Sequence, residues 1–193
     1  MERSAVYRRA LAPVMIFVGA VGLVAAAVGL AASINTERSF ILYWAAVAAV
    51  ALAGSFLLVR RQALRDAEPF WSPPTRRVTQ AFLPPLVAGF ALSGVVFARM
   101  SRMGLEPSGF VQLLPGWVVL YGCAFHAAGF FMPRGMRLFG WIFIVAGCAL
   151  YAVDVPVPLA KVYLHGTMGF FFGVLHLAYG GYLYLTEKGK NAA

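Results

Sequence analysis

Long apolar runs dominate the sequence, and the last of them, residues 162–185, constrains the fold most. A run of about 20 apolar residues is long enough to cross the hydrocarbon core of a bilayer as one helix. Helices suit such runs because lipid offers no hydrogen-bonding partners to an open backbone. The composition agrees: 61% of the residues are hydrophobic and 12% are charged, whereas about a quarter are charged in a soluble domain. We therefore expect an integral membrane protein.

The apolar runs predict an all-α fold, a polytopic membrane bundle of six transmembrane helices that forms a single domain over residues 1–193. The first run follows a basic amino end, as in a signal peptide, but it exceeds the 7–15 apolar residues of such a peptide and is expected to be retained. The six expected spans are residues 11–32, 40–59, 78–98, 111–131, 138–153 and 162–185.

Lysine and arginine predict the orientation. The amino end, loop 60–77, loop 132–137 and the tail after residue 185 hold 12 of the 16 basic residues, and the loops of the other side hold four. Basic loops stay cytoplasmic, so both termini should face the cytoplasm. Arginine outnumbers lysine 13 to 3 and alanine is abundant, which is typical of a GC-rich bacterial genome. We therefore expect a multi-pass protein of the bacterial inner membrane.

The expected partners follow from the same distribution of charge. The net charge is +9, but the basic residues lie in short loops, without the basic stripe of a nucleic-acid-binding face. No nucleic-acid partner is therefore expected. The lipid bilayer is the first partner, and a membrane protein or a second copy of the chain is the second.

Two stripes of small residues predict close helix packing. At about 100° per residue, the last span places a mixed stripe of glycine and histidine on one face. The first span has a small-residue face of its own, and such faces allow helix backbones to approach closely. We expect both stripes to be buried against other helices. The residues are His165, Gly169, Gly173, His176 and Gly180 in the last span, and Gly19, Gly22, Ala26 and Gly29 in the first.

Two histidines within spans are the main candidates for a functional site. His126 in span four and His176 in span six are predicted to lie at similar depths, and ionisable residues in a span usually face the protein interior. We predict a buried polar site between these spans. The favoured interpretation is a neutral, hydrogen-bonded contact without a cofactor, in which the hydroxyl groups of Tyr121 and Tyr179 or backbone carbonyls are the partners.

Two alternatives give the histidines a ligand. In the first, His126 and His176 are the axial ligands of haem b, with room left by glycines of the same helices, Gly122, Gly129, Gly173 and Gly180. Packed helices lie only about 8–10 Å apart, which counts against a macrocycle between them. In the second, Cys123, His126 and His176 hold a transition metal, because Cys123 and His126 are three residues apart and share a helix face.

A second polar cluster is expected at the outer end of the last span. His165 lies about one turn inside that end, with Lys161 and Asp154 nearby in sequence. A solvated histidine at the membrane interface is the favoured interpretation. Tyr43 and Trp44, at the start of the second span, are likewise expected to be interfacial aromatics.

Prolines and a long loop set the remaining expectations. Residues 60–77 are predicted to lie on the membrane surface, with Phe70 and Trp71 as anchors rather than as a binding site. Proline lacks a backbone donor, so span three is expected to start at Pro84 and Pro85, with a kink as the alternative. Pro115 leaves the start of span four open in the same way.

The function expected from these features is non-enzymatic. The loops are too short for a soluble catalytic domain. The sequence therefore predicts a small transporter-like module or an accessory membrane subunit. The alternative is a haem-binding electron-transfer protein, as described above.

Overall fold

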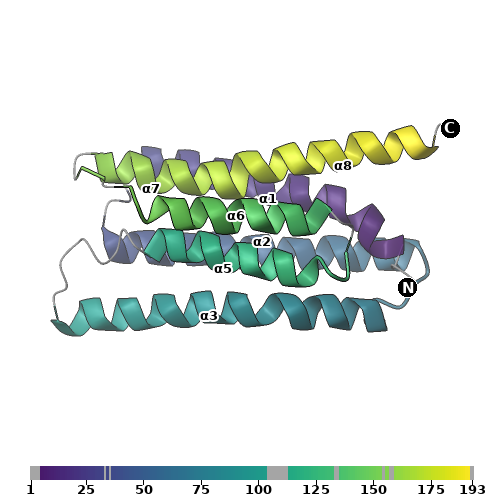
Figure 1. The fold of residues 1–193 in the computed structure, drawn as a ribbon, viewed down its shortest axis with the longest axis horizontal. Coiled ribbons are helices and arrows are strands. Elements are labelled where there is room, and N and C mark those ends of the chain that lie inside the picture. The colour runs from purple at the N-terminus through teal and green to yellow at the C-terminus, as the bar shows by residue number, and fades with distance from the viewer. Residues whose placement is uncertain are drawn as a thin grey trace. The chain divides into compact units, whose positions relative to one another are not determined.

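The chain is all-helical in the part that the structure describes. This computed structural model describes residues 5–32, 34, 36–103, 113–132, 135–153, 155–156 and 159–191. Figure 1 colours the helices in chain order, from purple at the amino end to yellow at the carboxyl end. They are α1 (Ala5–Ala31), α2 (Glu37–Arg65), α3 (Pro73–Met103), α5 (Leu113–Ala128), α6 (Gly135–Leu150), α7 (Ala160–Met168), the π-helical segment η2 (Gly169–Val174) and α8 (Leu175–Asn191).

Four of the helical segments are long and apolar enough to cross a membrane: Ala10–Ala31, Glu37–Arg65, Pro73–Arg99 and Ala160–Thr186. The last of them runs through α7, η2 and α8, so the expected final span is one continuous helix. The apolar helices α5 and α6 are shorter, with 16 residues each. The fold therefore agrees with a helical membrane protein.

The described residues belong to two compact units. The first comprises Met1–Ile34, Leu42–Ser72 and His165–Ala193, and the second comprises Asn35–Ile41 and Pro73–Leu164. The first unit thus contains α1, most of α2, η2 and α8. The second contains the first turn of α2 together with α3, α5 and α6.

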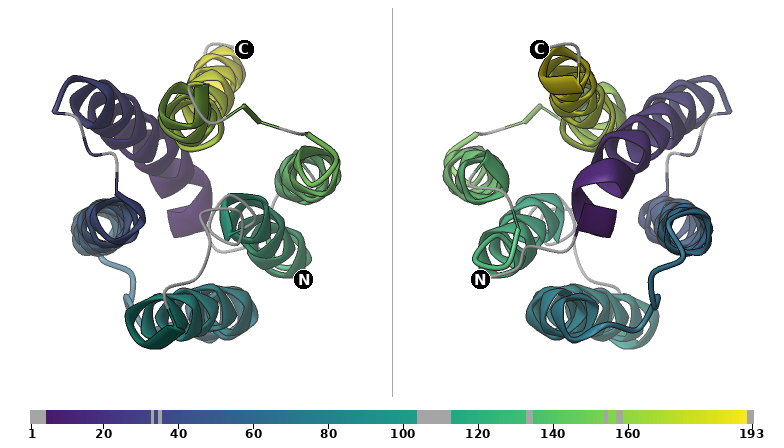
Figure 2. Two further views of the ribbon diagram at one scale, coloured as in Figure 1. Left: turned by 90° about the vertical axis from the view of Figure 1, so that its left-hand side faces the viewer. Right: turned by 90° about the vertical axis from the view of Figure 1, so that its right-hand side faces the viewer.

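In the first unit, α1 packs along the final helix (Figure 2). The two helices run in opposite directions, because Gly19 lies against Leu177 and Gly29 lies against His165. A Cβ atom on Gly19 would lie 2.7 Å from the Leu177 nitrogen, and one on Gly173 would lie 2.8 Å from Leu23 Cγ. Real Cβ atoms essentially never come within 3.0 Å of such a neighbour. The two predicted small-residue stripes are therefore confirmed, and they pack against each other.

In the second unit, α5 and α6 form a close pair. Gly122 and Gly140 lie where the two backbones meet, and a Cβ atom on Gly140 would be 2.6 Å from the backbone nitrogen of His126. Next to this contact, α3 joins α5 through a cluster of rings, in which Phe82 and Phe125 meet edge to face with centroids 5.0 Å apart. This unit is thus held by a glycine contact between α5 and α6 and by aromatic packing that joins α3, α5 and α6.

The start predicted for span three is wrong. α3 begins at Pro73 and continues through Pro84 and Pro85. Pro73 and Pro74 occupy the first turn, where a missing backbone donor costs nothing because the helix has no partner for it there. Pro115 also lies within the first turn of its helix, α5, which begins at Leu113.

The predicted surface loop 60–77 is also shorter than expected. Its arginines extend the helices on either side, since α2 ends at Arg65 and α3 begins at Pro73. In the short connection that remains, the ring of Phe70 meets Phe56 of α2 edge to face at 5.1 Å, while Trp71 is exposed. Phe70 thus packs against the protein, and the role of Trp71 as a membrane anchor stays a prediction.

Candidate functional site

His165 is fully buried in the first unit, so the prediction of a solvated interfacial histidine is wrong. Its Nδ1 atom accepts a hydrogen bond from Trp44 Nε1 at 3.3 Å, and its Nε2 atom lies 3.2 Å from the Ile34 carbonyl oxygen. A carbonyl oxygen can only accept, so Nε2 carries the hydrogen and the ring is neutral. Both ring nitrogens are therefore engaged by neighbouring backbone and side chain.

The pocket around this ring is built from three helices. Gly29 of α1 gives the ring its room, because a Cβ atom there would collide with His165 Nδ1 and Cε1. Tyr43 of α2 packs edge to face on the ring and donates a hydrogen bond of 2.6 Å from its hydroxyl group to the Ala25 carbonyl oxygen. Trp44 is only 3% exposed, so it is a buried hydrogen-bond donor and not the interfacial aromatic that was expected.

His176 is buried just after the π-helical segment. Leu175 donates its N–H group to the Phe170 carbonyl, five residues back, and α-helical bonding resumes in α8. This change of register passes over the carbonyl oxygen of Phe171, which His176 Nδ1 meets at 2.8 Å. Because a carbonyl oxygen only accepts, Nδ1 is the donor, and in the neutral ring the lone pair lies on Nε2. The backbone carbonyl is one of the two kinds of partner predicted for this ring.

His126 differs from the other two histidines. Its Nδ1 atom is buried and has no hydrogen-bond partner among the described residues. The ring meets the rings of Phe130 and Trp141 edge to face, at centroid distances of 5.4 Å and 5.3 Å. A satisfied polar contact was favoured for His126, and at Nδ1 this contact stays a prediction. Most buried polar atoms in native structures are hydrogen-bonded, so this atom calls for an explanation.

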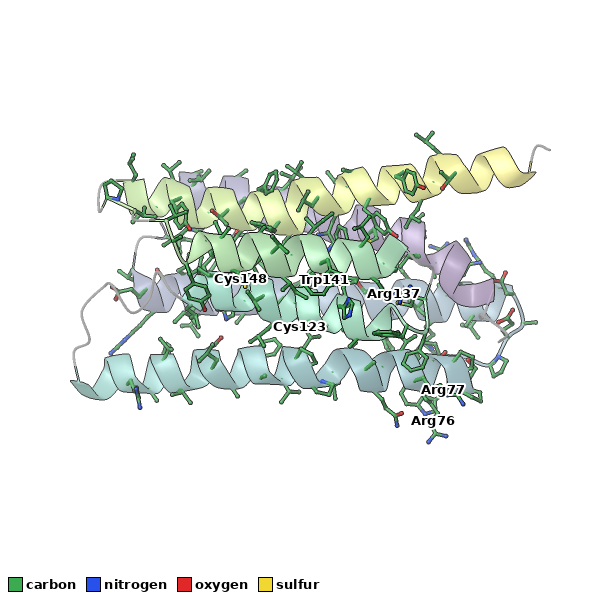
Figure 3. All side chains as sticks on the ribbon, in the orientation of Figure 1. Arg76, Arg77, Cys123, Arg137, Trp141 and Cys148 are labelled. Atoms are coloured by element: carbon green, nitrogen blue, oxygen red, sulfur yellow. The ribbon has the colours of Figure 1, made fainter. Side chains whose placement is uncertain are left out.

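On α6, Trp141 meets the His126 ring, and Arg137 lies over the neighbouring Phe130 ring. The guanidinium group of Arg137 lies 5.2 Å from the centroid of the Phe130 ring. Trp141 follows one turn later and is exposed. Figure 3 shows both residues on α6, with Cys123 on α5. The second unit therefore presents an imidazole, two aromatic rings and one positive charge within a short stretch of two helices.

The glycines that might have made room for a haem are used in helix packing. Gly122 lies against the backbone of α6 and Gly129 against Arg137, while Gly173 and Gly180 lie against Leu23 and Ile16 of α1. A macrocycle would therefore have to use other faces of these helices.

The structure describes all but one of the remaining residues predicted for a metal or polar site. Within neither unit do three His, Cys, Asp or Glu side chains of the described residues gather to hold a metal ion. Cys123 and His126 belong to the second unit and His176 to the first, so their combination stays a prediction. Tyr121 packs among aromatic rings, and Tyr179 stacks on Tyr182 with centroids 6.2 Å apart. Asp154 lies outside the described residues.

Sequence reasoning missed the pairing of Trp44 with His165. A signal was present, because Trp44, Gly29 and His165 all lie within about two turns of the same side of the predicted membrane.

The comparisons do not assign the chain to a family. No protein-family model matches it, and no curated protein or solved structure is significantly similar to it.

Proposed function

We propose that the chain is a six-span protein of the bacterial inner membrane with both termini in the cytoplasm. It would act as a non-enzymatic transporter-like module or as an accessory membrane subunit, with His126 as the residue that meets its ligand or partner. The observation that carries this proposal is the buried Nδ1 atom of His126, which has no partner in the described part of the chain. The pairing of His126 with His176 remains a prediction from the sequence.

An unsatisfied buried polar atom costs about 1–3 kcal/mol of folding stability. Proteins accept such losses mainly at functional sites. The other two histidines, which are buried, should stabilise the protein, because their rings bond to backbone carbonyls. This contrast gives a test. The variant His126→Phe should be as stable as the wild type or more stable, whereas His165→Phe should lose stability.

The measurement is the free energy of unfolding in mixed micelles, followed by circular dichroism. Equal losses in His126→Phe and His165→Phe would show that His126 is a structural residue. The ligand or partner is then sought by crosslinking from a photoreactive phenylalanine at position 141. The crosslinked product should depend on His126 and should vanish in His126→Phe.

The span count has its own test, because α5 and α6 are short. Sixteen residues extend about 24 Å as a helix, against about 30 Å of hydrocarbon. Six spans would bring the α5–α6 connection to the cytoplasm, whereas a re-entrant pair of helices would leave it inside the membrane. Both arrangements keep the two termini on one side, so reporters at the ends cannot separate them.

Cysteine labelling separates the two arrangements. In a Cys123→Ala, Cys148→Ala background, a single cysteine at Gly135 should react with a membrane-impermeant maleimide from the cytoplasmic side. Arg65→Cys is the cytoplasmic control and Thr36→Cys the outer one. If Gly135→Cys reacts from neither side while both controls react, the protein does not have six spans.

A second candidate function is electron transfer with haem b, and the geometry of His176 favours it. A histidine that ligates a metal usually donates its other ring nitrogen to a carbonyl or carboxylate, which fixes its orientation. His176 donates Nδ1–H to the Phe171 carbonyl at 2.8 Å, which places the lone pair on Nε2. His126 and His176 would be the two axial ligands.

An absorption spectrum of the protein purified from cells supplied with a haem precursor tests this candidate. A Soret band should be lost in His126→Ala and in His176→Ala. It should persist in His165→Ala, since both nitrogens of His165 are already bonded. A colourless wild-type protein would exclude the haem function and leave the first proposal standing.

A further inference from the structure

The start of α3 carries a basic hollow of about 190 Å³. Its lining residues in the described part of the chain are Pro73, Arg76, Arg77 and Gln80, with no acidic side chain among them. Arg76 and Arg77 are cationic, and all four residues are exposed. Figure 3 shows Arg76 and Arg77 projecting from the first turns of the helix. A hollow with two arginines among its lining residues suits a phosphate, whose oxygens match the planar donor fork of arginine.

An apolar stripe continues from this hollow along the same helix face. Residues 76, 80, 83, 87 and 90 alternate in spacing between four and three, so they share one face of α3. After Arg76 and Gln80, this face continues with Leu83, Val87 and Phe90, which are 53%, 55% and 48% exposed. The side chains of this face therefore change from cationic to apolar in the direction that leads into the membrane.

The length of the stripe matches one leaflet. From Gln80 to Phe90 the helix rises about 15 Å at 1.5 Å per residue. Half of a hydrocarbon core about 30 Å thick is also about 15 Å. A molecule with a phosphate in the hollow and an acyl chain along the stripe would therefore fill one leaflet.

We propose that this face of α3 binds an anionic phospholipid, with the headgroup phosphate between Arg76 and Arg77 and an acyl chain on Leu83, Val87 and Phe90. The inference rests on the proposed membrane location, and in the proposed topology the lipid belongs to the cytoplasmic leaflet. A free phosphate ion would use the arginines alone. The exposed apolar stripe directly below them favours the lipid.

Native mass spectrometry of the purified protein in detergent tests this site, with added phosphatidylglycerol or phosphatidylcholine of the same chain length. Phosphatidylglycerol should bind more tightly by roughly tenfold, because basic residues near the membrane surface attract anionic lipids. The double variant Arg76→Gln, Arg77→Gln should lose this preference. The matched control Arg60→Gln, Arg61→Gln removes the same charge from α2 and should keep it. Circular dichroism confirms that each variant is folded.

Three results would overturn the proposal. The first is the absence of a preference for phosphatidylglycerol, and the second is an equal loss in both double variants. The third is displacement of the lipid by millimolar inorganic phosphate together with unchanged binding in Leu83→Ser, Val87→Ser, which would assign the hollow to a free ion. Cell fractionation tests the membrane location separately, so a protein found in the membrane without a lipid preference would refute only this inference.

Discussion

The contact between Gly29 and His165 allows the sharpest prediction. A Cβ atom at position 29 would collide with the ring atoms Nδ1 and Cε1 of His165. The ring cannot easily move, because Trp44 and the Ile34 carbonyl hold its two nitrogens at 3.3 Å and 3.2 Å. We therefore expect Gly29→Ala to destabilise the protein.

The magnitude follows from opposing effects. Overpacking a well-packed site costs about 1–3 kcal/mol, and weakening one buried hydrogen bond adds about 1 kcal/mol. Replacing glycine by alanine in a helix returns up to about 1 kcal/mol. The net loss should be about 1–3 kcal/mol in the free energy of unfolding, measured in mixed micelles by circular dichroism.

The control and a double-mutant cycle make this prediction refutable. Gly166 lies in the same helix as His165, and a Cβ atom added there would meet nothing within 4 Å, so Gly166→Ala should be neutral or slightly stabilising. In a His165→Ala background the collision is absent, and Gly29→Ala should then cost nothing. The reasoning fails if Gly29→Ala matches Gly166→Ala, or if its cost is the same with and without the His165 ring.

Two further substitutions test the buried polar pair and the second unit. Trp44→Phe removes the hydrogen-bond donor to His165 and should cost about 1–2 kcal/mol in the same unfolding assay. The control Trp71→Phe changes an exposed tryptophan and should alter stability by less than about 0.5 kcal/mol. Equal effects would show that the hydrogen bond contributes nothing to stability. Gly140→Ala would place a Cβ atom 2.6 Å from the backbone of the facing helix and should cost about 1–3 kcal/mol of stability. The control Gly94→Ala adds a Cβ atom with nothing within 4 Å and should not lower stability. A stable Gly140→Ala protein would contradict the close packing of α5 and α6.

The sequence predicted the helices because their cause is local. An apolar run in lipid must satisfy its own backbone, and a helix does so within the segment. The two small-residue stripes were predictable for a related reason, since side chains at helical spacing share a face whatever the neighbour is. The bounds were less predictable. The helix α3 runs through Pro84 and Pro85, and nothing in the local sequence separates a tolerated proline pair from a helix start.

The partners of the stripes and the state of each histidine were decided by tertiary structure. His165, His176 and His126 look alike as single ionisable residues in apolar runs. One bonds to a tryptophan of another helix, one bonds to a carbonyl passed over by a π-helical turn, and one keeps a buried nitrogen without a partner in the described part of the chain. These differences depend on which helix lies opposite and on one extra residue in a turn. The sequence by itself therefore determined that the chain forms apolar helices with packing faces, and the three-dimensional contacts decided which ring nitrogens find a partner within the described part of the chain.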